Sequence, residues 1–160
     1  MVDFKTYEIV KLEDVAEYAR AKQGKIYPAG TSTLQISATR GEISFLSEQG
    51  YVHTKNVAII PQAGIDPLYF NIAMQRNIDL FMHKYATGIN IQESEVGKFP
   101  IYLHDYETQK AIVAMFRQLE HEMMVERDTV NVLKDLKNNM KELKMDNEYV
   151  CLIKNYLKER

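Results

Sequence analysis

The residues after Tyr106 contain neither glycine nor proline up to Arg160, and most of them are good helix formers. Within residues 106–145, apolar residues recur at steps of three or four, with a single longer step, which predicts a long amphipathic helix. At about 1.5 Å per residue such a helix extends ~60 Å, far beyond the radius of gyration of about 13 Å of a ~100-residue globule. Part of the apolar stripe must therefore be covered by a partner, a second copy or a folded-back tail.

The stripe predicts where this cover binds. Glu126 interrupts it and Lys137 adjoins it, which disfavours a long two-stranded zipper and allows a shorter antiparallel pairing. A break near Asp146 and Asn147 predicts a second helix over residues 148–158, the expected internal cover. The residues predicted to form the partner or dimer interface are Ile112, Phe116, Leu119, Met123, Val130, Leu133, Leu136 and Met140, and the same stripe continues to Leu143.

The residues before this helix have a different pattern, in which short apolar alternations are separated by glycine and proline. Helical spacing from Leu12 to Ala19 predicts a short helix. Alternating apolar residues over 34–38, 43–45 and 57–59 predict strands, with turns at Gly30, Gly41 and Gly50.

A second helix in this part is predicted to begin at Asp66 and Pro67, because Asp caps free backbone N–H groups and Pro fits the first helical position. It is expected to run to about Lys84, followed by strands around residues 89–91 and 99–103. The fold class is therefore α+β: a mixed domain over residues 1–105 with a small twisted sheet and short helices, then a long coiled-coil-like helical arm over residues 106–160.

Composition restricts the possible functions. The 160 residues carry a formal net charge of -2, which argues against binding nucleic acid over the whole surface and requires a local basic patch if DNA is bound. The single cysteine, Cys151, excludes an intramolecular disulfide and a multi-cysteine zinc site. The sequence has no signal-like N-terminus and no run long enough to span a bilayer, so a cytoplasmic protein that does not contact a membrane is expected.

Two segments are candidates for contact with DNA, because their polar and basic side chains can bind phosphates or base edges. In the first, Arg40 precedes Gly41, which permits close backbone approach. In the second, an aromatic residue and amides surround Gly88. The alternative for both is an ordinary solvated strand face or helix end. The predicted DNA-binding residues are Lys22, Lys25, Thr33, Gln35, Thr39, Arg40, Lys84, Tyr85, Thr87 and Asn90.

No pattern of residues predicts catalysis, a metal or a cofactor. The histidines at positions 53, 83, 104 and 121 lack the spacing of metal ligands. The sequence has no Walker-type glycine loop, nucleophile elbow or dinucleotide fingerprint. The carboxylates Glu93, Glu95, Asp105 and Glu107 flank predicted strands, where acidic side chains are usually solvated. A metal-dependent nuclease is therefore disfavoured, and no catalytic residue is assigned.

Three stretches in order carry a family resemblance. They are "YEIVKLEDVAEYARAKQGKIYP", "LQISATRGEISFLSEQGYVHTKNVAIIPQAGIDPLYFNIAM" and "YATGINIQESEVGKFPIYLHDYETQKAIVAMFRQLEHEM". Together they resemble one half of the specificity subunit of type I restriction-modification systems, over about residues 7–145. The matching positions are Pro100, Glu107, Gln109 and the helix from Lys110 onward. The sequence departs from the family in retaining only Pro100 where a proline-rich run usually precedes the glutamine.

The resemblance implies a DNA-reading subunit that performs no bond chemistry. The family's subunits usually contain two recognition domains, each followed by a long helix on which methyltransferase subunits dock, and a nuclease-translocase subunit can join the complex. One such unit therefore predicts a homodimer that reads two half-sites of double-stranded DNA. The alternative is a helical adaptor or truncated paralogue that binds the methyltransferase without reading DNA. Basic residues scattered over the domain would favour this alternative.

Overall fold

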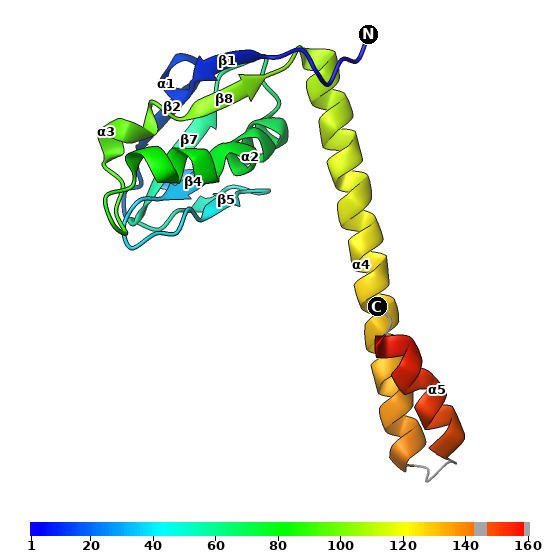
Figure 1. Cartoon of the computed structure of the whole chain (residues 1–160). Helices are drawn as coiled ribbons and strands as arrows, with labels where there is room; N and C mark the ends of the chain where they lie inside the picture. Colours follow the sequence, from blue (N-terminus) through cyan, green and yellow to red (C-terminus); the bar gives the residue numbers. More distant parts are fainter. Residues whose placement is uncertain (143–146, 159–160) are drawn as a thin grey trace. The chain divides into compact units, whose positions relative to one another are not determined.

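The structure is a computed structural model that describes residues 1–142 and 147–158. It divides into two compact units, Met1–Val113 and Ala114–Arg160, which we describe separately (Figure 1). The first unit combines small antiparallel sheets with short helices, and a long helix follows, so the predicted α+β class is confirmed. None of the described helices combines the length and the hydropathy that spanning a bilayer requires.

The main sheet of the first unit has four antiparallel strands in the order β2-β7-β4-β5. These strands are β2 (Ala16–Arg20), β7 (Asn56–Pro61), β4 (Ser32–Gln35) and β5 (Ile43–Phe45). Two smaller antiparallel pairs complete the strands, β1 (Glu8–Lys11) with β8 (Pro100–Leu103), and β3 (Ile26–Tyr27) with β6 (Gly50–Tyr51). The short helices of this unit are α1 (Leu12–Val15) and α3 (Glu93–Val96).

The helix α2 (Pro67–Tyr85) begins where the sequence predicts. The carboxylate of Asp66 accepts hydrogen bonds from the backbone N–H groups of Leu68 and Tyr69, and Pro67 occupies the first turn. The helix packs against β8, β5, β4 and β7, as Figure 1 shows. It therefore joins the four-stranded sheet to the β1–β8 pair.

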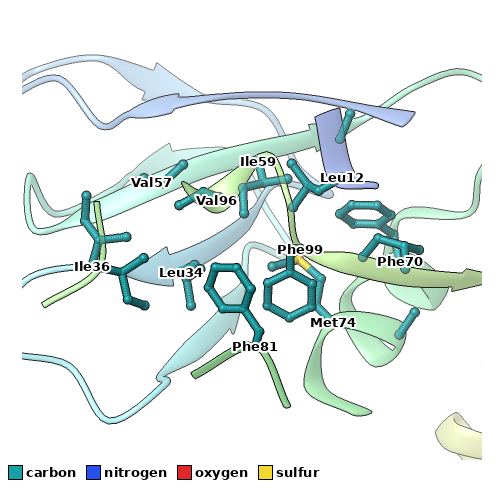
Figure 2. Packing of buried hydrophobic residues seen from close by; sticks show 14 of the residues in the cluster. Leu12, Leu34, Ile36, Val57, Ile59, Phe70, Met74, Phe81, Val96 and Phe99 are labelled. Atoms are coloured by element: carbon teal, nitrogen blue, oxygen red, sulfur yellow. The ribbon is translucent and has the colours of Figure 1, made fainter. Parts of the chain in front are cut away.

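The core lies between α2 and the strands (Figure 2). The rings of Phe81 and Phe99 have centroids 4.5 Å apart, and both side chains are buried. Leu34 and Ile59 contribute from the four-stranded sheet, and Leu12 contributes from α1. The helix α2 is thus held mainly by the removal of aromatic and branched apolar surface from water.

The prediction of a helix over residues 12–19 is wrong. Only Leu12–Val15 is helical, and Ala16–Arg20 forms strand β2, which pairs with β7 from Ala16 opposite Pro61 to Arg20 opposite Val57. Leu12 and Ala16 are buried, as they would also be in a helix over residues 12–19. The apolar pattern therefore did not distinguish that helix from a short helix followed by a strand. In strand β2 the backbone groups pair with β7, and a second helical turn would lose these hydrogen bonds.

Two expected strands are also corrected. Strand β4 ends at Gln35, because Ala38 adopts a left-handed conformation with a φ of 50°. Ile89 and Ile91 form no regular strand. Their backbone groups pair instead with Thr39 and Ile36 of the β4–β5 loop.

The helix α4 (Tyr106–Glu142) has 37 residues and begins within the first unit. There Val113 is buried in the core, and the partly buried Ile112 packs against this core. The side chain of Gln109 accepts a hydrogen bond from the backbone N–H of Asp66 and donates one to the carbonyl of His104. The first compact unit therefore extends past residue 105 and includes the start of the long helix.

In the second unit, α4 continues and is accompanied by α5 (Asn147–Lys158), where a second helix was predicted. Met123 and Val130 of α4 line a groove together with Tyr156 and Leu157 of α5. Val130 and Leu133 are half-buried, as is Leu157, whereas most of the described side chains of α4 in this unit are exposed. The short helix therefore covers part of the apolar stripe of α4.

The core packing of α2 predicts a strong contrast between two neighbouring positions. Phe81 is 1% exposed and Leu80 is 57% exposed. Phe81→Ala should lower the free energy of unfolding by about 3–5 kcal/mol, because it leaves a cavity beside Phe99. Leu80→Ala should change it by less than about 0.5 kcal/mol. Urea unfolding followed by circular dichroism measures both, and equal losses would contradict the packing described.

Candidate nucleic-acid interface

The loops that carry the candidate DNA-binding residues lie at one end of the four-stranded sheet. Strand β2 ends at Arg20, opposite Val57 near the start of β7, and β4 ends at Gln35, opposite Asn56. The β4–β5 connection leaves from this same end, since Leu34 is opposite Ile43. We call this end, formed by residues 20–25, 36–42, 52–54 and 84–92, the loop end.

Hydrogen bonds join the two predicted segments to each other. The backbone N–H of Thr39 donates to the carbonyl of Ile89 at 2.8 Å, and the N–H of Ile91 donates to the carbonyl of Ile36 at 2.9 Å. The side-chain oxygen of Asn90 accepts a hydrogen bond from the backbone N–H of Ala38 at 3.1 Å. Segments about fifty residues apart in the sequence therefore form one continuous surface.

The backbone around Ala38 is strained and is held by its neighbours. A non-glycine residue with a φ of 50° pays a steric cost because its Cβ approaches the backbone. The amide of Gln35 donates hydrogen bonds to the carbonyls of Ser37 and Ala38, and Asn90 binds the N–H of Ala38. Gln35 and Asn90, both predicted to contact DNA, thus use part of their hydrogen-bonding capacity to shape the loop.

The turn that presents Arg40 is fixed by Glu42. Its carboxylate accepts hydrogen bonds from the hydroxyl of Thr39 at 2.7 Å and from the backbone N–H of Arg40 at 2.8 Å. These two bonds, the first being the stronger influence, hold the pKa of Glu42 below its ordinary value. The Thr39 hydroxyl also accepts a hydrogen bond from the N–H of Gly41. The side chain of Arg40 is exposed beside this turn.

Arg20 is a residue of the loop end that the sequence did not single out. Its guanidinium donates to the carbonyl of Thr54 at 2.9 Å and to the hydroxyl of Ser37 at 3.4 Å, while its backbone N–H donates to Glu93. It therefore ties three loops together and adds positive charge between them. The incorrect helix prediction over residues 12–19 hid its place at a strand end.

Lys22 and Lys25 lie in the loop that follows β2 and share a shallow groove with Arg20 and Tyr27. Both lysines are exposed, and the ammonium of Lys25 lies 4.9 Å from the centroid of the Tyr27 ring. The groove places these two lysines beside Arg20 at the loop end, and their contact with DNA stays a prediction.

The C-terminal turn of α2 brings Lys84 to the same end, and Thr87 follows in the exposed loop. The ring of Tyr85 is less available for contact with DNA than the sequence suggested. Its ring lies 5.1 Å from that of Phe81, it packs against the core, and the ammonium groups of Lys84 and Lys98 lie 5.2 Å and 5.8 Å from its centroid. Tyr85 therefore acts as a support for lysines and does not offer a free face to a base.

Two predicted contact residues lie inside the domain. Thr33 is 4% exposed and Thr39 is 2% exposed. Thr33 lies within β4, between β5 and β7, and the hydroxyl of Thr39 is engaged by Glu42 and Gly41. Neither side chain reaches the surface, so the prediction that they contact DNA is corrected.

The residues of the predicted partner interface on α4 differ in how far they are buried. Ile112 packs against the core of the first unit, so it is removed from the predicted interface. Phe116, Val130 and Leu133 are half-buried. The side chains of Met140 and Leu143 lie outside the described residues. The predicted positions that stay largely exposed are Leu119 at 57%, Met123 at 61% and Leu136 at 48%.

No cluster typical of a metal centre is formed within the part of the chain that the structure describes, where no three His, Cys, Asp or Glu side chains come together. His104 is buried and serves a structural role, since its ring contacts the hydroxyl of Tyr69 at 2.7 Å and the carbonyl of Phe4 at 3.3 Å. Asp105 accepts hydrogen bonds from the hydroxyl and backbone N–H of Thr108, which hold its pKa below its ordinary value. These contacts stabilise the start of α4.

Comparison with known proteins identifies the fold. No family model and no curated protein matches the chain. A solved structure from work on the assembly and conformational transition of a type I restriction-modification system matches with a TM-score of 0.65 and 14% identity. The match covers 82% of this chain and 43% of that one.

Two further solved structures agree with this match. The type I S subunit from M. genitalium matches with a TM-score of 0.60 and 16% identity, over 82% of this chain and 44% of that one. The HsdS subunit from Thermoanaerobacter tengcongensis matches with a TM-score of 0.58 and 11% identity, over 77% of this chain and 39% of that one. The chain therefore has a type I specificity-subunit fold, as its resemblance implied, and spans less than half the length of those chains.

The packing of the loop that presents Arg40 predicts different stability costs for alanine substitutions at two glycines with positive φ. Gly41 has a φ of 95°, and a Cβ added there would lie 2.8 Å from Cγ1 of Ile78. Gly24 has a φ of 76° with nothing within 4 Å of such a Cβ. Gly24→Ala should cost about 1 kcal/mol of unfolding free energy for the left-handed backbone, and Gly41→Ala about 1–3 kcal/mol more for the clash with α2. Thermal unfolding of both variants measures the difference, and equal costs would show that the loop is not packed on α2.

Proposed function

We propose that the chain is a DNA-binding specificity subunit of a type I restriction-modification system. The first unit reads a half-site of double-stranded DNA, and α4 docks methyltransferase subunits; in some assemblies a nuclease-translocase subunit joins them. The chain itself makes and breaks no bonds. The fold supports this proposal at the level of the family, and the loop end supports it at the level of residues.

The observation that carries the proposal is the gathering of basic side chains at one end of a sheet. Lys22, Lys25, Arg40 and Lys84 come from three separate segments, and the fold brings them to the loop end. A basic surface built on short loops, with a rigid sheet behind it, suits contact with phosphates and base edges.

The same gathering argues against the adaptor function. A helical adaptor or truncated paralogue that only binds the methyltransferase would need no basic loop end and no hydrogen-bonded coupling between the loops. Here Asn90 supports Ala38, and Arg20 ties Ser37 to Thr54, so the loops are held in a defined arrangement. Such preorganisation is expected of a surface that discriminates between ligands.

The proposal includes a homodimer. Leu119 and Met123 expose apolar surface on α4 in the second unit, although Met123 also lines the groove with α5, which covers part of the stripe farther along. Exposed apolar residues at helical spacing favour association with another helix. A second copy of the chain would supply that helix and a second recognition domain, so that the pair reads two half-sites with two-fold symmetry.

The DNA-reading role predicts different effects for two basic residues, once methylation-site mapping of the assembled complex has identified the target. Arg40→Ala should weaken binding to that target by about 1–3 kcal/mol and relax selectivity at one position. Lys84→Ala should weaken binding to all sequences and reduce the salt dependence by about one counterion. Lys11→Ala, an exposed lysine on β1, is the control. Unchanged affinity and selectivity in both test variants would remove the assignment of the loop end.

The homodimer predicts a dependence on the exposed stripe. At micromolar concentration the wild-type chain should sediment as a dimer, and Leu119→Glu should shift it toward the monomer, because a carboxylate is costly in an apolar helix contact. His121→Glu places the same charge at an exposed position outside the apolar stripe and should leave the dimer intact. A wild-type chain that sediments as a monomer would oppose the proposed homodimer.

A further inference from the structure

An exposed arginine lies against two stacked tyrosine rings beside the β1–β8 pair. The rings of Tyr7 and Tyr102 are parallel within 4°, with centroids 4.7 Å apart. The guanidinium carbon of Arg76, on α2, lies 5.0 Å from the Tyr102 centroid and 5.6 Å from the Tyr7 centroid. The arginine is therefore held in place by cation–π contacts with both rings.

A network beneath the rings makes this arrangement rigid. The hydroxyl of Tyr69 donates to the carbonyl of Tyr102 and accepts a hydrogen bond from the backbone N–H of His104 at 3.0 Å. The ring of His104 lies 5.5 Å from the ring of Tyr7 and contacts the carbonyl of Phe4. The pKa of Tyr69 is raised by burial, so its hydroxyl stays protonated and keeps its donor at neutral pH.

Arg76 keeps its hydrogen-bonding capacity. In the described residues it forms no ion pair and no side-chain hydrogen bond, and its guanidinium lies over the two rings. An aromatic face satisfies the charge of a guanidinium in part but leaves the N–H donors at its edge available. A planar anion such as a carboxylate can accept two of these donors at once.

Apolar side chains border the arginine. Ile9 is directly opposite Tyr102 across the β1–β8 ladder, so the two side chains point to the same face, and Ile9 is 63% exposed. Leu80 lies one helical turn after Arg76 on α2 and is 57% exposed. Tyr7 is 37% exposed. We call these five residues, Tyr7, Ile9, Arg76, Leu80 and Tyr102, the Arg76 platform.

We propose that the Arg76 platform is a protein-docking site that receives an acidic side chain, flanked by apolar residues, of the methyltransferase subunit. This inference rests on the proposed function, and it adds a contact on the first unit to the docking proposed for α4. Arginine and tyrosine bordered by exposed aliphatic residues are the composition of interface hot spots. An exposed, preorganised cation is complementary to an anionic side chain on a partner.

The composition of the platform favours a protein over DNA as its ligand. A phosphate-binding surface is typically lined by several basic and hydroxyl side chains, as at the loop end. Here Arg76 is the sole cation among residues that are otherwise aromatic or aliphatic. Burial of Ile9 and Leu80 would add apolar area that a duplex backbone cannot cover.

The experiment measures the affinity of the full-length chain for the purified methyltransferase subunit by calorimetry, and separately its affinity for target duplex in the assembled complex. Arg76→Glu should weaken methyltransferase binding about tenfold or more, as for a hot-spot residue, and Leu80→Asp should weaken it in the same direction. Arg76→Lys, which keeps the charge and loses the planar pair of donors, should fall between the wild type and Arg76→Glu. Lys55→Glu gives the same charge reversal at an exposed turn and should bind like the wild type.

A purely structural role would give a different result. If the arginine only fastens the N-terminal segment, Arg76→Glu lowers the melting temperature, and Leu80→Asp, at an exposed position, changes neither stability nor binding. If Arg76→Glu and Leu80→Asp both bind the methyltransferase as tightly as the wild type does, the docking site is overturned and the proposed function still stands. Loss of duplex affinity with unchanged methyltransferase affinity would make the platform a DNA contact. A wild-type chain that binds no methyltransferase at all would refute the proposed docking function together with the platform.

Discussion

The burial of α2 against the strands is the constraint on which the rest of the first unit depends. Phe81 on this helix packs against Phe99, and the carboxylate of Asp66 caps its first turn. The segment that leaves its C-terminus pairs with the β4–β5 loop through Thr39 and Ile36. The loop end is therefore positioned by an apolar core, so its loops can vary in sequence while their starting points stay fixed.

The long helix shows how one apolar pattern can serve several environments. Ile112 and Val113 belong to the core of the first unit, and Leu119 is exposed. Val130 and the largely exposed Met123 line the groove shared with α5. Periodicity identifies the apolar side of a helix but carries no information about what covers it. The sequence therefore predicted the helix well and treated as one interface a stripe that the structure divides.

Features decided by a few neighbouring residues were predictable from the sequence, and features decided by distant segments were not. The start of α2 was predictable because capping by Asp66 and Pro67 is decided within a few residues. Strand β2 was missed because its partner β7 lies about forty residues away, and Thr33 was assigned to the surface because alternation alone does not tell which face of a central strand is covered. The sequence did not indicate the surface around Arg76, because Tyr7 and Tyr102, whose rings the arginine contacts, come from distant segments.

A net charge of -2 does not conflict with DNA binding when the acidic residues near the loops have other partners. The carboxylate of Glu42 is engaged by Thr39 and the backbone of Arg40, and that of Glu93 accepts the backbone N–H of Arg20. These carboxylates shape the turns that present basic side chains, and none of them forms an ion pair with Arg20 or Arg40 among the described residues. Their negative charge nevertheless lies close to the phosphates that the loops would approach. In the proposed function the affinity of one domain for DNA should therefore be modest. The proposed second copy would offset this, because two weak half-sites held at a fixed spacing bind far more tightly than one.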